Sequence, residues 1–257
     1  MAGIWGFPLW EGQGIAANRI AAALAAIGPG LEPPGAALAA EAWRQAWRPP
    51  RLRLLLLAES HMATAAEELA TPMLPAPGWP HPAGFSRHLY CPAYGEPSLV
   101  PGLAAARNAG TGQYWRLLAL AEGSPPPTRA AFPQATGRLA AKLALLRRLR
   151  DRGIWLTDAS VVAVAGPGGQ RLPPAAHAAA LRESWRCFHG PLLPPLRPVH
   201  VLVIGLAVAR VLGPRLDESF PGRWSAIPQP MGARGAAPAA ALLDTLAEAM
   251  RRHAPAD

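Results

Sequence analysis

The chain has 257 residues, of which 51% are hydrophobic, enough for the core of one large domain or two small ones. Its only cysteines, Cys91 and Cys187, exclude a disulfide scaffold and any four-cysteine metal or cluster site, and they favour a reducing, cytoplasmic location. The formal net charge of +9 suits a polyanion, nucleic acid first and an anionic membrane second, although an arginine-rich and alanine-rich composition alone also accounts for it.

Two further features concern membranes and export. The first residues contain no basic segment followed by an apolar core, so no secretory signal is predicted. No apolar stretch approaches the roughly 20 residues that a membrane span requires. We therefore expect no association with a membrane. Separately, we expect the protein to be a monomer.

The first third of the chain predicts helices, then a strand. Apolar spacing indicates helices over residues 16–27 and 36–47, separated by breaks rich in glycine and proline. The unbroken apolar run at 53–58 is typical of a strand buried on both faces. A short helix over 64–69 and a short strand within 85–92 follow, joined by a proline-rich loop.

The middle of the chain alternates between helix and strand. Helices are predicted over 112–122 and 140–152, the second closed by a glycine. A strand over 154–157 follows, then a helix from Pro174 to about His189 and a buried strand over 198–205.

The last third completes the pattern with a short helix ending at Leu212, a strand over 223–227 and an amphipathic helix over 236–252. Strands that alternate with helices predict a three-layer α/β/α fold with a central, mostly parallel four-stranded sheet. We expect residues 51–257 to form this α/β domain, and residues 1–50 to form a helical extension packed on it.

Polar residues follow three of the predicted strands. They are Glu59-Ser60-His61, Asp158 with Ser160, and the segment from Gln229 to Arg234. In open parallel α/β sheets, ligands bind outside the carboxyl ends of the strands, and these ends share one edge. The three clusters therefore predict one site at that edge.

The segments that carry these clusters resemble the uracil-DNA glycosylase superfamily, in its iron–sulfur branch. Residues 57–62 (LAESHM) are similar to that branch's motif Gly-Glu-Ala-Pro-Gly. Residues 156–174, with Leu-Thr-Asp, Val-Val, Gly-Gly-Gln-Arg and Pro-Pro in order, resemble Thr-Asn-Val-Val-Lys-Cys-Arg-Pro-Pro-Gly-Asn-Arg-x-Pro. Residues 201–213 look like its next strand and helix, and 228–231 (PQPM) fall where the superfamily has His-Pro-Ser.

The resemblance implies that a base is flipped out of DNA and that its bond to the sugar is hydrolysed. Cleavage of this bond builds positive charge on the sugar and negative charge on the base. Glu59 then corresponds to the carboxylate that orients water and stabilises the cation. Gln229 stands where the family has a His that stabilises the departing base. His61 has no counterpart in the family motif, but it could act as a base or a leaving-group donor beside Glu59.

The resemblance also implies residues that bind the base and the phosphates. Asp158 replaces a base-reading Asn, and because a carboxylate only accepts hydrogen bonds, it would prefer a base that offers two donors over uracil. The cluster cysteines are absent, so no iron–sulfur centre or other cofactor is expected. The remaining candidates are Ser60 beside the base, Phe85, Tyr90 and Tyr94 for stacking, and Arg171 and Arg234 for phosphate contacts.

Each of these residues also has an ordinary structural explanation. Glu59 could cap the following helix, and Asp158 could form an Asx turn. The aromatic residues could belong to the core, and the arginines could be solvated. His61 could be a hydrogen-bonded structural residue, and a metal site with His88 and Cys91 matches no standard ligand spacing.

Two other functions stay open. The substitutions at Asp158, Gln229 and His61 motivate a catalytically impaired or repurposed protein that binds nucleic acid or a nucleotide without cleaving it. A hydrolase that uses Ser60 as nucleophile is the third hypothesis, but Ala58 and Met62 replace the glycines that a nucleophile elbow needs.

Overall fold

In the computed structural model, the described residues are 13–28, 30–80, 84–100, 111–232 and 235–255. They belong to two compact units, each of which is considered by itself. Unit 1 comprises Met1–Ala46, Glu59–Ala106 and Asp158–Pro195, and unit 2 comprises Trp47–Ala58, Arg107–Thr157 and Leu196–Asp257. Residues up to Ala46 thus share a unit with two later segments of the chain.

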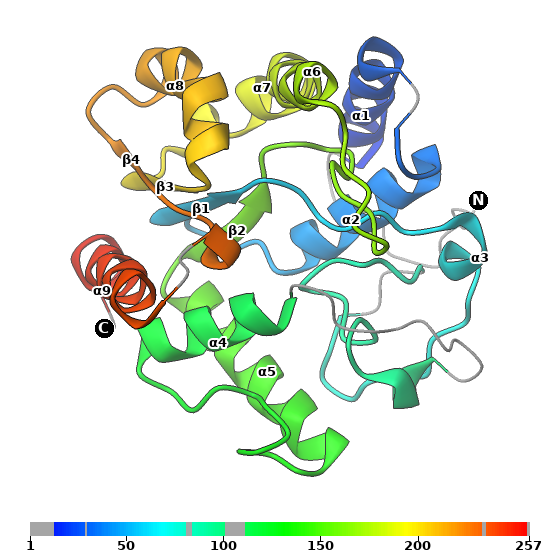
Figure 1. Ribbon diagram of the computed structural model, residues 1–257, viewed down its shortest axis with the longest axis vertical. Helices are drawn as coiled ribbons and strands as arrows, with labels where there is room; N and C mark the ends of the chain where they lie inside the picture. The colour runs from blue at the N-terminus through cyan, green and yellow to red at the C-terminus, as the bar shows by residue number, and fades with distance from the viewer. Residues whose placement is uncertain (1–12, 29, 81–83, 101–110, 233–234, 256–257) are drawn as a thin grey trace. The chain divides into compact units, whose positions relative to one another are not determined.

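Unit 2 contains a four-stranded parallel sheet in the order β2-β1-β3-β4 (Figure 1). The strands are β1 (Leu54–Ala58), β2 (Ile154–Asp158), β3 (His200–Ile204) and β4 (Trp224–Ile227). The side chains of β1 and β2 are buried throughout, as an apolar run flanked by helices requires. Because all strands run in one direction, their carboxyl ends lie at one edge and their amino ends at the other.

Helices cover both faces of this sheet. On one face, α8 (Leu206–Ser219) contacts β3 and β4; on the other, α9 (Ala236–His253) contacts β1. A further helix, α4 (Thr111–Glu122), packs on α9, and α5 (Ala135–Asp151) leads into β2 (Figure 1). The predicted three-layer α/β/α fold with a parallel sheet is therefore confirmed.

Two helices of unit 2 are longer than the sequence pattern predicts. The helix expected to end at Leu212 continues to Ser219 with Pro214 in its interior. Leu212 and Leu216 are both fully buried, and this burial outweighs the backbone hydrogen bond that the proline removes. Helix α5 begins at Ala135 rather than at residue 140.

Unit 1 is built from helices and long connecting segments. It contains α1 (Gln13–Ile27), α2 (Pro34–Ala46), α3 (Ala66–Leu69), α6 (Pro174–Ser184), the π-helical turn Trp185–His189 and the short α7 (Gly190–Leu192). Helix α1 packs against α2, α6 and the π-helical turn. The core of unit 1 includes Ile20, Ala37, Val161, Val162 and Phe188.

The prediction of a short strand within residues 85–92 is wrong. The segment forms successive turns, closed by hydrogen bonds from the Cys91 amide to the His88 carbonyl and from the Tyr94 amide to the Cys91 carbonyl. Its consecutive side chains from Phe85 to Tyr94 are almost all buried, whereas a half-exposed strand would bury alternate ones.

Among the described helices, none combines the length and apolar character needed to cross a membrane.

Candidate functional site

Glu59 directly follows β1, and its carboxylate is held by two basic side chains of unit 1. Its Oε1 lies 2.9 Å from Nε2 of His177 on α6, and its Oε2 accepts a hydrogen bond of 3.0 Å from Nη2 of Arg171. The Glu59 side chain is 13% exposed, so the carboxylate is fixed in direction and still reached by solvent. Two charge-assisted contacts of this kind hold the carboxylate in place.

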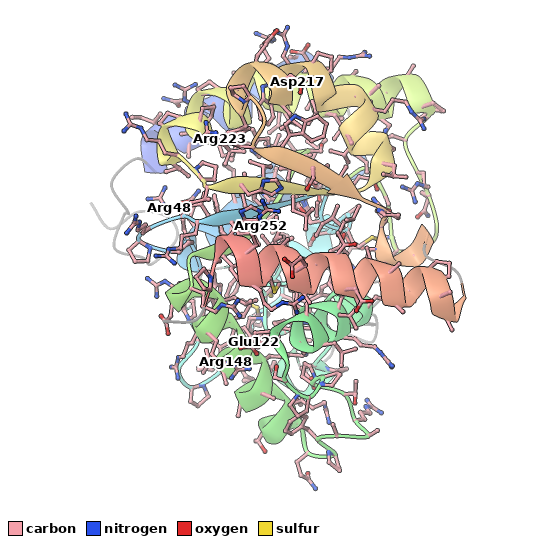
Figure 2. The ribbon with its side chains drawn as sticks, turned by 90° about the vertical axis from the view of Figure 1, so that its left-hand side faces the viewer. Arg48, Glu122, Arg148, Asp217, Arg223 and Arg252 are labelled. Carbon is pink, nitrogen blue, oxygen red and sulfur yellow. The ribbon has the colours of Figure 1, made fainter. Side chains whose placement is uncertain are left out.

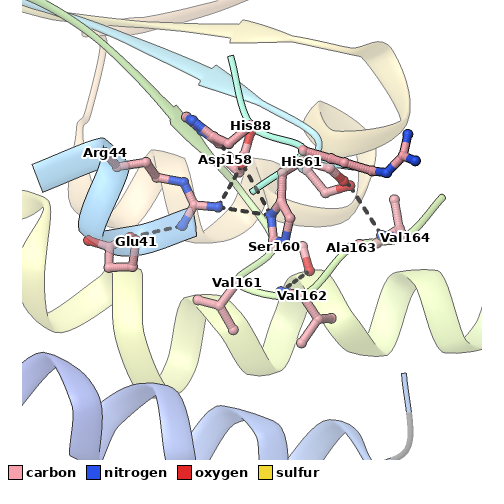
Figure 3. Close-up of polar contacts among 12 residues, drawn as sticks. Glu41, Arg44, His61, His88, Asp158, Ser160, Val161, Val162, Ala163 and Val164 are labelled. Carbon is pink, nitrogen blue, oxygen red and sulfur yellow. Dashed lines mark hydrogen bonds and ion pairs between the residues drawn. The ribbon is translucent and has the colours of Figure 1, made fainter. Parts of the chain in front are cut away.

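Asp158, the last residue of β2, points into a buried cluster of charged side chains (Figure 3). Its Oδ2 accepts a 2.7 Å hydrogen bond from Nη2 of Arg44, which is completely buried on α2. The other terminal nitrogen of Arg44 donates to Oε2 of Glu41 at 2.8 Å. His61 Nδ1 and His88 Nε2 each lie 3.6 Å from the same Asp158 oxygen.

The two predicted carboxylates thus belong to neighbouring segments but to different clusters. The Ser160 amide donates to the Glu59 carbonyl at 3.0 Å, which joins the segments that follow the two strands. The side chain of Glu59 contacts His177 and Arg171, whereas the side chain of Asp158 contacts Arg44 and the two histidines.

His61 links this buried cluster to Glu32. Its Nε2 lies 2.8 Å from Oε1 of Glu32, and its Nδ1 lies 3.0 Å from Nη2 of Arg44. Arg44 can only donate, so the second contact is a hydrogen bond when Nδ1 carries no proton. In the imidazolium form, Nδ1–H instead faces the carboxylate of Asp158.

The charges of the cluster shift the pKa values of Asp158 and His61 in opposite directions. Burial acts to raise the pKa of Asp158, but Arg44 and the histidines outweigh it and hold this pKa well below its usual range. Burial acts to lower the pKa of His61, but Glu32 and Asp158 outweigh it and raise this pKa to about 9. The two carboxylates beside the ring, those of Glu32 and Asp158, favour the added positive charge.

Two other histidines beside the cluster are held neutral. Burial, opposed by Asp158 and assisted by Arg44, lowers the pKa of His88 to about 3. The Tyr90 amide donates to His88 Nδ1 at 3.1 Å, which places the proton on Nε2. Burial and Arg44 likewise lower the pKa of His189 to about 3, and its Nε2 has no hydrogen-bond partner among the described residues.

The loop after β2 is buried, and side chains satisfy its backbone amides. The Val161 amide donates to the hydroxyl of Ser184. The Val162 amide donates to the hydroxyl of Ser160 (Figure 3). The Ala163 amide donates to Oε1 of Glu32, and the Val164 amide donates to the Ser60 hydroxyl. Buried amides need such partners, so this loop explains why serines and an acid occur in an otherwise apolar environment. The carboxylate of Glu32 also accepts a hydrogen bond from the Thr64 amide.

Ser60 therefore has a backbone role. Its hydroxyl donates to the His61 carbonyl at 2.8 Å and accepts from the Val164 amide. The His61 ring contacts Glu32 and Arg44 instead of this hydroxyl. This arrangement lacks the serine–histidine hydrogen bond on which a serine nucleophile depends.

The three aromatic residues expected to stack on a base are buried in unit 1. Phe85, Tyr90 and Tyr94 have exposed fractions of 0%, 4% and 1%. Phe85 meets Tyr94 edge to face with ring centres 6.4 Å apart, and Tyr90 lies 5.2 Å from the His88 ring. A base could stack on any of them only after this packing opens, so their role in stacking stays a prediction.

The remaining predicted residues are distributed as follows. Arg171, expected at a phosphate, forms the ion pair with Glu59 and is otherwise exposed. Gln229 belongs to unit 2, two residues after β4, and its side chain packs over Gly205, where an added Cβ would lie 3.3 Å from its Cγ. Arg234 lies outside the described residues.

Sequence reasoning missed Arg44, Glu32 and His177. Arg44 follows Ala37 and Ala40 at helical spacing, so it falls on the buried face of α2, where a charged residue signals a buried partner. His177 lies one turn inside α6 and after Arg171, a position that could have identified it. Glu32 gave no such signal, because it lies in a short break between two helices.

Among the described residues, no group of three His, Cys, Asp or Glu side chains is arranged to hold a metal ion. The chain matches no protein-family model, no curated protein and no solved structure. The resemblance to the uracil-DNA glycosylase superfamily therefore rests on the motifs quoted above.

Proposed function

We propose that this protein hydrolyses the N-glycosidic bond of a flipped base in DNA, with Glu59 as the central catalytic residue. The observation that carries the proposal is the environment of its carboxylate, which His177 and Arg171 fix in place while it stays partly exposed. The base can be a modified one and need not be uracil.

The chemistry of glycosidic cleavage suits a carboxylate of this kind. The departing base leaves positive charge on the sugar, and a fixed anion stabilises this charge more in the transition state than in the bound substrate. Each carboxylate oxygen has more than one acceptor direction, so Glu59 can also accept a hydrogen bond from the attacking water. His177 and Arg171 act by holding Glu59 rather than by touching the reacting atoms.

A second candidate is a protein that binds nucleic acid or a nucleotide without cleaving it. It is favoured by the engagement of Asp158, whose Oδ2 is already taken by Arg44 and which is 4% exposed. A carboxylate in this position stabilises the fold and offers little to an incoming base.

The experiment that separates the two uses DNA oligonucleotides, each with one deaminated, oxidised or alkylated base. Release of the base leaves an abasic site that alkali converts into a strand break. We expect breaks with the wild type and with the control Glu67→Gln, an exposed glutamate of the same unit, and a loss of breaks with Glu59→Gln. Binding without breaks across the whole set would instead support the second candidate.

A further inference from the structure

Unit 2 concentrates arginines at the edge of the sheet where its four strands begin. Arg53 precedes β1, Arg152 precedes β2, Arg197 precedes β3 and Arg223 precedes β4. Figure 2 shows Arg223 with Arg48 and Arg252 toward the left of the view, at this end of the sheet. We call the whole set the arginine edge: Arg48, Arg51, Arg53, Arg150, Arg152, Arg197, Arg223 and Arg252.

Hydrogen bonds hold the segments of this edge together. The Arg53 amide donates to the Gly153 carbonyl, and the Val199 amide donates to the Arg53 carbonyl. Arg150 donates from its side chain to the Arg48 carbonyl, and Arg223 donates to the Pro198 carbonyl. The arginines therefore start from one rigid framework rather than from separate loops.

The arginines of the edge have little direct compensation from carboxylates among the described residues, although Glu122 acts electrostatically on Arg152. Some exposed arginines elsewhere pair with acids, as Arg148 does with Glu122 and Arg215 with Glu218. The side-chain hydrogen bonds that Arg150, Arg152 and Arg223 form go to backbone carbonyls. Among the described residues, no member of the arginine edge forms an ion pair with a carboxylate.

The arginine edge keeps an excess of positive charge after the nearby negative groups are counted. Asp151 lies within the edge, and Asp217, bonded to the Trp224 indole, lies beside it. The helices α5, α8 and α9 end here, and each carboxyl terminus carries about half a negative charge. Among the described residues, eight arginines against these groups leave an excess of about four positive charges.

We propose that the arginine edge binds the phosphodiester backbone of a nucleic acid. Guanidinium groups match phosphate oxygens in pairs, which ammonium groups do not. Four neighbouring strands span about 14 Å. One strand of B-form DNA presents about four phosphates over this length. The proposal concerns the amino edge of the sheet and does not depend on base cleavage by Glu59.

An anionic membrane fits this surface less well. Binding to a lipid surface needs apolar side chains that enter the acyl boundary in addition to positive charge. Among the described residues of the edge, Val199 is the one large apolar side chain that is exposed. The surface thus offers charge without an apolar anchor.

The test measures binding of the full chain to a short duplex without modified bases, as DNA and as RNA, by fluorescence anisotropy over a range of salt concentrations. We compare the wild type with a triple variant, Arg48→Gln, Arg51→Gln and Arg252→Gln, whose side chains are exposed. The control variant changes the exposed Arg129, Arg210 and Arg215 to Gln, which removes the same charge from other parts of unit 2.

For at least one duplex we expect the edge variant to bind at least about tenfold more weakly, with the salt slope of log K reduced by about three. The control variant should retain the wild-type slope. No binding to either duplex, equal losses in both variants, or edge-dependent binding to phosphatidylserine vesicles alone would overturn the proposal.

A second measurement needs no variant. An arginine-specific dicarbonyl reagent modifies exposed arginines, and mass spectrometry locates the products. Bound duplex should protect Arg51 and Arg197 from modification and leave Arg129 reactive. Unchanged modification of Arg51 and Arg197 under saturating duplex would contradict the proposal.

Discussion

Asp158 and Arg44 are 114 residues apart in the sequence, and their side chains form a buried ion pair of 2.7 Å in unit 1. Glu41 contacts the other terminal nitrogen of the same guanidinium, so one arginine neutralises parts of two buried carboxylates. Within unit 1, this pair fixes Asp158 and the loop after it relative to α2.

The first prediction concerns the stability that Arg44 provides. Arg44→Met fills a similar volume but leaves Asp158 and Glu41 buried without their cation, and breaking a buried pair in this way costs about 3–5 kcal/mol. Urea denaturation should show this loss. The control Arg210→Met, at an exposed position, should change stability by no more than about 0.5 kcal/mol. A loss below about 1 kcal/mol for Arg44→Met would mean that the pair behaves like one at the surface.

The second prediction concerns His61 at alkaline pH. Its folded-state pKa of about 9 lies above the ordinary value of 6.5, so the folded protein binds this proton more tightly than the unfolded chain. The resulting stabilisation is complete below pH 6.5 and is lost as the pH rises through 9. Melting temperatures from pH 6 to 10 should therefore fall more steeply for the wild type than for His61→Gln. Parallel curves for the two proteins would contradict the raised pKa.

The third prediction concerns His189, whose pKa is lowered on folding, whereas that of His61 is raised. Its folded-state pKa of about 3 lies below the ordinary value of 6.5, so the unfolded chain binds the proton first. The stability it contributes is present above pH 6.5 and is lost as the pH falls toward 3. His189→Gln should flatten the acid limb of the stability curve, measured by denaturation between pH 7 and 4. An equally steep acid limb in the variant would show that His189 is not held neutral.

The fourth prediction separates positioning from folding at His177. His177→Ala removes a donor to Glu59, and misplacement of a catalytic group lowers the rate by up to about 10²-fold. The loss should appear in kcat, and His177→Asn, which retains a donor, should recover part of it. The melting temperature should stay near that of the wild type, because His177 is partly exposed. Full kcat in His177→Ala would remove this histidine from the proposed site.

Much of the fold follows from local sequence. The apolar runs of β1 and β3 are long enough for one strand and too short for a helix of ordinary length, and the glycine at 153 closes the helix before β2 with a positive φ. The turns at 85–92 were missed, because a segment buried on all sides shows no regular spacing of apolar residues in its sequence. The pairing of Arg44 with Asp158 could not be predicted either, because no local sequence pattern relates residues so distant in the chain.

In the candidate site too, local features could be predicted from the sequence and long-range contacts could not. The position of Glu59 after a buried strand is visible in the sequence, because an apolar run ends abruptly in a charged residue. Its partners are not visible, since His177 and Arg171 approach it from 118 and 112 residues away. Long-range contacts of this kind depend on how the helices pack.

The proposed function requires Glu59 for hydrolysis of a glycosidic bond. The most direct measurement is the amount of base released from a modified duplex by excess enzyme in a single turnover, detected by mass spectrometry. We predict release of the base by the wild type and a loss of about 10²-fold or more in Glu59→Gln, with the fold intact. No release from any modified base, or equal release by Glu59→Gln, would contradict the account.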